Sequence, residues 1–322
     1  MSFNAVVVGL GNIARRHRAN IKKMFSGATV YALSSSGRTP DTIPDNCDVF
    51  LSCFDAIPFT DIDVAIIASP APFHKTHALV FIEKNIPTLI EKPVATNVHD
   101  VEEIMSASSK NRTPVGVGYC LRFLPSSSIV KSFISENRLG DIYNVFIETG
   151  QHLSQWRPGK DYMQSVTAQK ALGGGALFEL SHEFDYCQWI FGALTIQHAI
   201  VRSSSQLGLD VEDQADIVAS TRAGGIINIH LDLLQHKVTR TCRVIGSEGT
   251  LEWNLVANKV IVFDKQGERI IYEDAQWDKN NMYIDMLSRF ISNADDVNPV
   301  ATLTESLGVV RLISDIKSVA KN

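Results

Sequence analysis

Ionisable side chains gather in one short segment of the chain. Four of them recur at spacings of three and four residues: Glu179, His182, Glu183 and Tyr186. This spacing predicts that they share one face of a helix expected over Gly175–Phe191. Because nearby carboxylates raise the pKa of an imidazole and orient its tautomer, we expect His182 to contact substrate or accept a proton. Glu179 and Glu183 would orient it. A helix-surface ion cluster without chemistry has the same spacing.

A glycine-rich segment near the start of the chain has the pattern of a dinucleotide-binding turn. It reads Gly9-Leu-Gly11-Asn12-Ile13-Ala14, between a short apolar run and a helical pattern. Gly9 permits a tight turn, Gly11 lets the backbone approach a pyrophosphate, and Ala14 allows close packing of helix on strand. The N–H groups at the helix start, at Asn12 and Ile13, then face the anionic phosphates.

The run after the second expected strand bears on the choice between NAD and NADP. An acidic residue here normally binds the ribose hydroxyls of NAD, but Ser34-Ser35-Ser36-Gly37-Arg38 contains none before Asp41. Serine hydroxyls and a guanidinium can hold a 2′-phosphate, so Ser34, Ser35 and Arg38 favour NADP over NAD. The same residues are typical of a polar loop.

A substrate loop is expected before the helix at Gly175. It supplies aromatic faces for a sugar ring and cations for a phosphate or carboxylate. These residues are Gln151, His152, Trp156, Arg157, Lys160 and Tyr162. The mixture indicates a charged or nucleotide-linked sugar, and it is equally the composition of a mobile loop.

No metal site is expected. His74 and His77 lie three residues apart at a helix start, without a third ligand in a suitable pattern. The five cysteines are widely spaced and contain no C-x-x-C pair, which argues against a zinc site or a disulfide framework.

The first third of the chain should position the nucleotide site. Short apolar runs alternate with amphipathic stretches up to Tyr119, the pattern of a parallel sheet covered by helices. Strands are expected at Asn4–Gly9, Thr29–Leu33, Val64–Ala68, Thr88–Ile90 and Val115–Gly118. Helices are expected at Ile13–Met24, Phe73–Lys84 and Val98–Asn111, the last with Asn97 as its N-cap.

The remainder should form a second domain. After a helix at 126–136, long alternating runs without intervening helices predict one large, mainly antiparallel sheet. Helices at about 175–191, 281–292 and 303–319 should cover one of its faces. The fold class is therefore α/β, with an N-terminal Rossmann parallel sheet and a C-terminal α+β domain that contains a large open sheet. The expected limits are 1–124 and 125–322.

Composition narrows the partners and the compartment. A net charge of −5 with scattered signs makes nucleic-acid binding unexpected. No apolar run reaches membrane-spanning length and no leader precedes the first strand, so we expect a cytoplasmic protein without membrane association.

Five segments together resemble the Gfo/Idh/MocA oxidoreductases in their order and spacing. They are Gly9-Leu-Gly-Asn-Ile-Ala14 followed by His17, Ala68-Ser-Pro-Ala-Pro-Phe-His74, Glu91-Lys92-Pro93, Gly118-Tyr-Cys-Leu-Arg-Phe123 and Gly173-Gly-Gly-Ala-Leu-Phe-Glu179. The resemblance departs from the common pattern on the last segment. Glu179 stands where the family usually has aspartate, Glu183 stands where it has histidine, and His182 comes one residue early.

The resemblance implies a site and a reaction. Lys92 would point at the reacting hydroxyl as proton acceptor and cation, opposite His182 and Glu179. Cofactor contacts would include Ser69, Pro70, His74, Glu91 and Lys92, and substrate contacts would include Tyr119, Arg122, Gln151, Trp156, Arg157 and Glu183. The expected activity is hydride transfer between NAD(P) and a small-molecule carbohydrate, a sugar or polyol, by a homodimer or homotetramer. Two alternatives stay open: a redox-neutral enzyme with tightly bound NAD(P), and a non-enzymatic nucleotide sensor.

Overall fold

The computed structural model describes residues 3–292 and 300–320. The described chain divides into two compact units. The first contains the chain up to Cys120 together with the segment from Asn280 to Leu307, and the second contains Leu121–Lys279 together with the chain from Gly308 onward. The return of the segment after Asn280 to the first unit was not expected from sequence. The limits 1–124 and 125–322 stay a proposal for the two domains.

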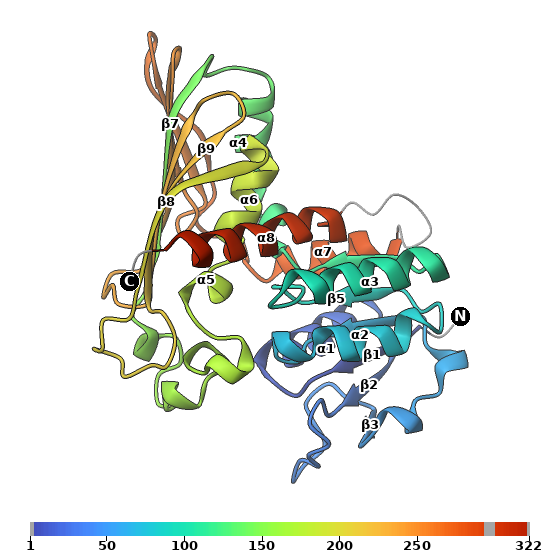
Figure 1. Cartoon of the computed structure of the whole chain (residues 1–322). Helices are drawn as coiled ribbons and strands as arrows, with labels where there is room; N and C mark the ends of the chain where they lie inside the picture. Colours follow the sequence, from blue (N-terminus) through green and yellow to red (C-terminus); the bar gives the residue numbers. More distant parts are fainter. Residues whose placement is uncertain (1–2, 293–299, 321–322) are drawn as a thin grey trace. The chain divides into compact units, whose positions relative to one another are not determined.

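The first unit is built on a parallel six-stranded sheet, as expected (Figure 1). The strand order is β3 (Val49–Leu51), β2 (Thr29–Leu33), β1 (Asn4–Val8), β4 (Val64–Ile67), β5 (Thr88–Ile90) and β6 (Val115–Val117). Every pairing within it is parallel. Ala5 to Val8 of β1 are fully buried because helices cover both faces of such a sheet. The edge strand β3 was not predicted.

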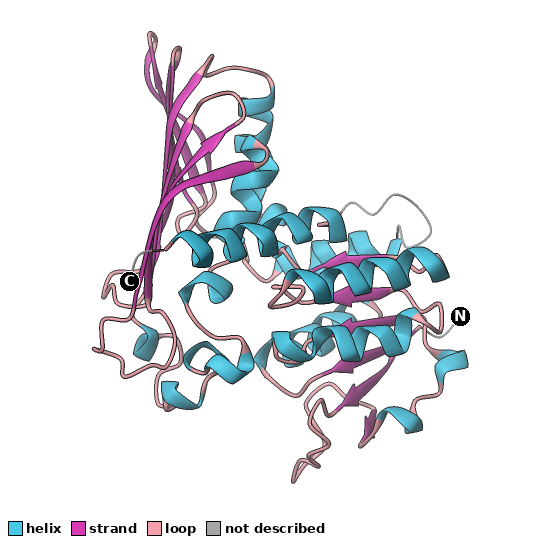
Figure 2. Cartoon of the chain, in the orientation of Figure 1, coloured by secondary structure: helices cyan, strands magenta, loops and turns pink. Residues whose placement is uncertain are grey.

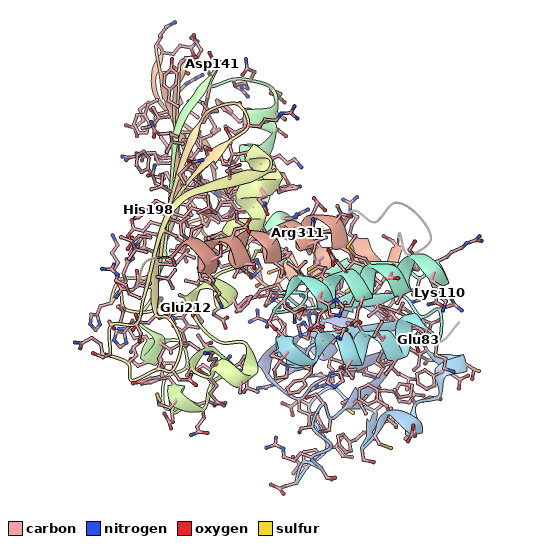
Figure 3. The ribbon with its side chains drawn as sticks, viewed as in Figure 1. Glu83, Lys110, Asp141, His198, Glu212 and Arg311 are labelled. Atoms are coloured by element: carbon pink, nitrogen blue, oxygen red, sulfur yellow. The ribbon has the colours of Figure 1, made fainter. Side chains whose placement is uncertain are left out.

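Among the described residues, four α-helices lie wholly within this unit: α1 (Asn12–Met24), α2 (His74–Ile82), α3 (Val98–Asn111) and α7 (Asn281–Ser292). The Asn97 side chain accepts a hydrogen bond from the N–H of Asp100 at 2.9 Å, which confirms it as the N-cap of α3. α7 packs against α1, so the prediction that residues 281–292 cover the large sheet is wrong. Charged residues such as Glu83 and Lys110 extend from the surface of this unit (Figure 3).

The second unit is built on an eight-stranded sheet, which confirms the expected mainly antiparallel arrangement (Figure 2). Its order is β14 (Gly267–Glu273), β13 (Lys259–Asp264), β12 (Gly249–Asn254), β11 (Thr239–Gly246), β7 (Ile142–Gly150), β10 (Ile226–Asp232), β9 (Gln214–Thr221) and β8 (Leu194–Arg202). Only β7 and β10 pair in parallel.

Helices pack on one face of this sheet: α4 (Pro125–Ser135), α5 (Ala176–Glu179) and α6 (His182–Phe191) (Figure 2). Ala215, Ile217 and Ala219 of β9 are buried beneath them, whereas Asp216 and Val218 alternate onto the other face. α8 (Leu303–Val319) begins in the first unit and continues into the second.

Candidate functional site

The turn between β1 and α1 has the geometry of a dinucleotide site. Gly9 has a φ of +121°, and a Cβ built there would lie 2.4 Å from the carbonyl oxygen of Ala68, so only glycine fits. A Cβ at Gly11 would meet no atom within 4 Å, which leaves this backbone open to a ligand. α1 begins at Asn12 without an acidic residue in its first turn, and the N–H groups there, including that of Ile13, have no intrahelical acceptor. This turn fits a pyrophosphate.

The three residues expected beside the adenosine ribose follow β2. Ser34 is buried, and its N–H donates to the carbonyl oxygen of Leu51 at 3.4 Å. Ser35 is half-buried and Arg38 is exposed. Exposure thus increases along the loop, from the buried Ser34 at the carboxyl end of β2 to the exposed guanidinium of Arg38.

In the turn after β5, the buried carboxylate of Glu91 holds the backbone of Lys92. Oε1 of Glu91 lies 2.6 Å from Nε2 of His17, and both side chains are almost fully buried. Oε2 of Glu91 accepts the N–H of Lys92 at 3.2 Å. A Cβ at Gly118 would lie 3.1 Å from the Glu91 carboxyl group, so the backbone just after β6 lies close to it. The peptide bond between Lys92 and Pro93 is cis, and Lys92 itself is half-buried. Glu91, expected at the cofactor, here holds the turn that presents Lys92.

His74 joins the turns that follow β4 and β5. Its ring is buried, with Nε2 2.7 Å from the carbonyl oxygen of Ser69 and Nδ1 3.0 Å from that of Pro93. Burial lowers the pKa of His74, and a neutral imidazole can donate to only one of these two carbonyls. His77 lies one helical turn on, with Nδ1 2.9 Å from Oγ of Ser69, and burial lowers its pKa to about 4. The two histidines bind this turn, which presents Ser69 and Pro70.

Tyr119, expected at the substrate, is fully buried in the first unit just after β6, where its N–H donates to the carbonyl oxygen of Val117.

In the second unit, the expected helix over 175–191 is broken into α5 and α6 at Leu180 and Ser181. The prediction of one uninterrupted helix is therefore wrong, and every residue from His182 to Cys187 is buried, so these side chains do not form a solvent-exposed ion cluster. Gly175 precedes the break with a φ of +102°, and a Cβ there would lie 2.4 Å from Oε1 of Glu212. That same oxygen accepts the N–H of Leu177 at 3.3 Å. The glycine thus allows the start of α5 to pack on a carboxylate.

Two residues expected at the substrate lie in buried ion pairs. Glu183 is fully buried, and its carboxylate accepts hydrogen bonds from the Arg240 guanidinium at 2.6 and 3.0 Å and from the Thr149 hydroxyl at 2.9 Å. Arg122 donates to both carboxylate oxygens of the buried Asp185, at 2.7 and 2.9 Å. These contacts tie α6 to the sheet and to the segment before α4.

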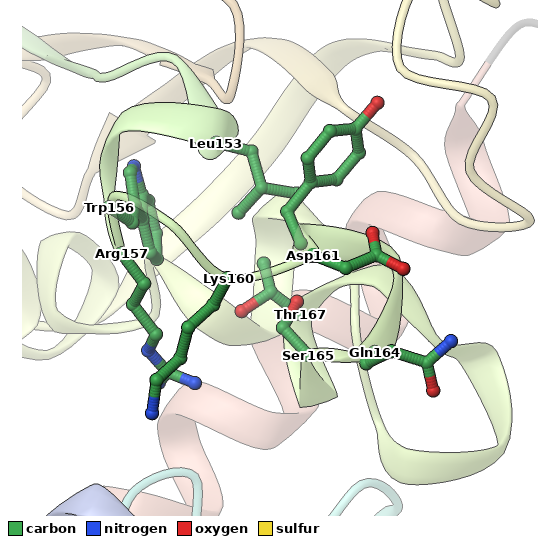
Figure 4. A pocket seen from close by; sticks show the side chains of 9 residues that line it. Leu153, Trp156, Arg157, Lys160, Asp161, Gln164, Ser165 and Thr167 are labelled. Carbon is green, nitrogen blue, oxygen red and sulfur yellow. The ribbon is translucent and has the colours of Figure 1, made fainter.

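Most of the remaining predicted residues of the second unit line a pocket of about 280 Å³ or bind a residue that lines it (Figure 4). Trp156 and Arg157 line it, and the Trp156 indole N–H donates to the backbone carbonyl of Gln151 at 3.0 Å. Thr167 also lines the pocket and donates to Oε2 of Glu179 at 2.9 Å. His182 lies at the start of α6 and is 9% exposed. The pocket and its hydrogen bonds thus bring together Glu179, Gln151, Trp156 and Arg157. Lys92 belongs to the other unit.

Sequence reasoning did not assign a site role to His17 or Thr167. His17 follows Ala14 by three residues on the buried side of α1, a position that reads as core in an amphipathic helix. Thr167 has no motif around it. Only the folded chain shows that each binds a candidate carboxylate, Glu91 and Glu179 respectively.

Two kinds of feature are absent from the described residues as a whole. No helix among them combines the length and apolar character needed to cross a membrane. Within the same ranges, no cluster of three or more histidine, cysteine or acidic side chains is arranged to hold a metal ion.

Two models of one protein family match the chain. The model described as oxidoreductase family, NAD-binding Rossmann fold matches residues 3–119. The model described as GFO/IDH/MocA C-terminal domain matches residues 128–252. Together they span most of the chain, one on each side of the expected domain limit.

Similar proteins include sugar and polyol dehydrogenases. Inositol 2-dehydrogenase of Klebsiella pneumoniae (strain 342) is 25% identical over 258 residues, which cover 77% of this chain and 73% of that protein. A solved structure of levoglucosan dehydrogenase in complex with NADH superposes with a TM-score of 0.86 at 19% identity, covering 99% of this chain and 97% of that one. An inositol dehydrogenase homolog from Azotobacter vinelandii complexed with NAD+ gives 0.82 at 15% identity, with coverage of 100% and 97%.

Proposed function

Because the chain belongs to the Gfo/Idh/MocA family of NAD-binding oxidoreductases, we propose that it transfers a hydride between a nicotinamide cofactor and a carbon of a sugar, polyol or sugar derivative. That carbon bears a hydroxyl group in one direction and a carbonyl group in the other. The observation that carries the proposal is the turn after β5, where buried Glu91 holds Lys92 at the carboxyl end of a parallel strand. In open parallel sheets, ligands bind outside the carboxyl ends of the strands.

The first unit supplies the cofactor residues in this proposal. The backbone of Gly9 to Ile13 takes the pyrophosphate, since Gly11 leaves it open and the first turn of α1 directs N–H groups outward. The adenosine ribose would meet Ser34, Ser35 and Arg38, and the nicotinamide side would meet the turns of Ser69, Pro70, Glu91 and Lys92. When bound, the cofactor supplies the acceptor or donor of the hydride.

Lys92 carries the proton in this proposal. Oxidation of an alcohol needs a group that takes the hydroxyl proton and a positive charge beside the developing alkoxide, and a lysine can provide both in turn. Its backbone N–H is fixed on Glu91, so the lysine stem starts from a rigid base. His74, bound between the two turns, acts as a positioning residue here rather than as a group over the cofactor.

Glu179 and His182 complete the proposed catalytic set. Glu179 is oriented by the Thr167 hydroxyl, and His182 begins the helix that follows the break. We assign His182 to substrate contact or proton transfer and Glu179 to its orientation. Glu183 leaves this group, because Arg240 and Thr149 already occupy its carboxylate inside the core.

The cofactor proposal includes a preference for NADP. Its support is the stretch from Ser34 to Pro40. This stretch contains no acidic residue to bind ribose hydroxyls, and it includes the exposed Arg38. The solved relatives named above hold NADH or NAD+, at identities that show the fold alone. A homodimer or homotetramer through the face of the large sheet opposite its helices is also proposed. Phe146 of the central strand β7 leaves 37% of its surface exposed there.

The test is a substrate panel with purified protein, NADP and NAD, read by nicotinamide absorbance in the near ultraviolet. Turnover with a sugar or polyol is expected, and Lys92→Ala should lower kcat/KM about 10²- to 10⁴-fold, the usual loss of a general acid–base group. Lys110→Ala, an exposed lysine of the same unit, is the matched control and should keep wild-type rates. Arg38→Ala should lower the NADP to NAD ratio of kcat/KM about tenfold.

Two results would count against the proposal. One is folded protein that changes the redox state of neither cofactor with any compound of the panel. The other is a Lys92→Ala variant as active as Lys110→Ala. Equal use of NAD and NADP by wild type and Arg38→Ala would remove the NADP preference alone.

A further inference from the structure

The pocket of the second unit is formed by one stretch of chain between β7 and α5 (Figure 4). Its lining residues are Leu153, Trp156, Arg157, Lys160, Asp161, Tyr162, Gln164, Ser165 and Thr167. The volume of about 280 Å³ is slightly smaller than that of typical small-molecule pockets, which hold about 300–1,000 Å³. A monosaccharide with one substituent suits this size better than a nucleotide-linked sugar.

Two aromatic rings of the pocket are fixed in place before any ligand binds. The Trp156 indole N–H donates to the carbonyl oxygen of Gln151 at 3.0 Å, and the Tyr162 hydroxyl donates to that of Leu207 at 3.2 Å. Both polar atoms are thus occupied, which leaves the ring faces and the Leu153 side chain as an apolar wall. The C–H faces of a sugar ring pack on such a wall, and prior ordering reduces the entropy lost on binding.

Two cations share one side of the pocket. Arg157 and Lys160 are three residues apart, both are exposed, and Figure 4 shows their side chains extending in the same direction. Neither forms an ion pair with another described residue. The nearby carboxylate of Asp161 accepts the N–H of Met163 at 3.0 Å and lies apart from the two cationic ends. Because like charges repel, an anion between these ends would lower the free energy of this side of the pocket.

Hydroxyl groups line the pocket elsewhere. Thr167 donates to Glu179 at 2.9 Å, so the pocket adjoins a proposed catalytic carboxylate. The Ser165 hydroxyl is inaccessible to solvent and has no hydrogen-bond partner within the described chain. A buried hydroxyl without a partner costs free energy, and rotation of the Ser165 side chain toward the pocket that it lines would let the hydroxyl of a bound sugar offset this cost.

From these contacts we infer that the pocket binds a monosaccharide through an anionic substituent, a phosphate or a carboxylate, held by Arg157 and Lys160. This inference rests on the proposed function and names the substrate class of that site. Arg157 can bind either anion through two parallel hydrogen bonds, and Lys160 adds a point charge. The ring would lie against Trp156, with its hydroxyl groups toward Ser165.

The test compares compounds that differ only in the anionic group: glucose, glucose 6-phosphate and glucuronate. Dissociation constants are measured by titration calorimetry on the full chain, with inorganic phosphate as a fourth probe that has no ring. We expect at least one anionic sugar to bind about tenfold or more tightly than glucose. The anionic sugar that binds more tightly identifies the group as phosphate or carboxylate.

Variants separate a pocket effect from general charge. Arg157→Gln and Lys160→Gln should each lower the preference for the anionic sugar about tenfold. Lys170→Gln removes an exposed lysine of the same segment that does not line the pocket, and it should keep the wild-type preference.

The inference is overturned if wild type binds no anionic probe more tightly than the Arg157→Gln variant does. It is overturned equally if glucose binds as tightly as both anionic sugars. Failure of the proposed function looks different, because it is an absence of cofactor turnover with every compound, whatever the order of the dissociation constants.

Discussion

At the scale of single residues, the decisive feature is a carboxylate that is buried and paired. Glu91 lies beneath the turn that carries Lys92, and His17 holds it from α1 at 2.6 Å. A second histidine–glutamate pair lies on the surface of the same unit, where His99 is 3.4 Å from Glu103. The two pairs have the same chemistry and opposite exposure, so they provide a matched comparison.

We predict that His17→Ala destabilises the protein by about 3 kcal/mol, because it leaves the Glu91 carboxylate buried without its imidazole partner. His99→Ala should cost less than about 0.5 kcal/mol, as for other exposed pairs on helices. The free energy of unfolding from urea titrations of each variant measures the difference. Similar losses for both variants would contradict a special role for the buried pair.

The His17 pair also bears on activity. The side chain of an asparagine at position 17 can still donate a hydrogen bond to Glu91. If His17 positions Lys92 through Glu91, His17→Asn should restore a larger fraction of the kcat lost in His17→Ala than of the stability lost in that variant. A variant that recovers stability and kcat in the same proportion would assign His17 to the core alone.

At the scale of elements, the turn from β1 to α1 contains two glycines with different roles, one in the packing of the turn and one in cofactor binding. Gly9→Ala should lower the melting temperature, because its Cβ would clash with the Ala68 carbonyl at 2.4 Å and its φ of +121° strains any other residue. Gly11 has a φ of −74° and open space around it. Gly11→Ala should therefore keep the melting temperature and weaken cofactor binding at least tenfold.

Thermal unfolding without cofactor and calorimetric titration with cofactor decide this comparison. A Gly11→Ala variant that binds NAD and NADP with wild-type affinity would show that no phosphate approaches this backbone. A Gly9→Ala variant as stable as wild type would mean that the turn relaxes around the new methyl group.

Most elements could be predicted because their signals are local. Fully apolar runs indicated buried parallel strands such as β1 and β4, and alternation indicated β9 and β10. β3 was missed because it has three residues, lies at the sheet edge and leaves Val49 exposed. The break at Leu180 and Ser181 was also missed, since helix periodicity runs through it without glycine or proline.

The candidate site was less predictable than the fold. Motifs indicated the turns of Gly9 and Lys92, which depend on neighbours in sequence. They could not show that Glu183 pairs with Arg240, or that Thr167 orients Glu179, because these partners are distant in the chain and meet only through tertiary packing. A polar residue on a helix reads as exposed until its partner is known.

At the scale of the whole molecule, one imidazole on the second sheet makes stability depend on pH. His230 lies between two carboxylates, with Nδ1 2.6 Å from Asp216 and Nε2 3.0 Å from Asp232. The hydrogen bond to Asp232, supported by Asp216 and opposed by burial, raises the pKa of His230 to about 9. Since this exceeds the unfolded value of 6.5, its contribution is complete below about pH 6.5 and is lost as pH rises through 9.

We predict that His230→Asn removes about 1 kcal/mol of stability at pH 6, a value kept small because the side chain is about a third exposed and solvent screens the pairs. At pH 10 the variant and the wild type should have nearly equal free energies of unfolding. Urea titrations at both pH values measure this, with the exposed His198 of β8 replaced by Asn as the control. A loss that is the same at both pH values would contradict the charged pairing.

The return of α7 to the first unit limits how this protein can be recombined with others. α7 packs on α1 and its residues Met286, Leu287 and Phe290 are buried, although more than 150 residues of the other unit intervene along the chain. A chimaera cut near residue 124 would separate the nucleotide-binding half from one of its own helices and uncover the side of α1 on which Tyr283 contacts His17 and Arg16. Exchange of substrate units between relatives therefore needs three crossover points: one after Cys120, one before Asn280 and one after Leu307, because the chain from Gly308 onward also belongs to the second unit.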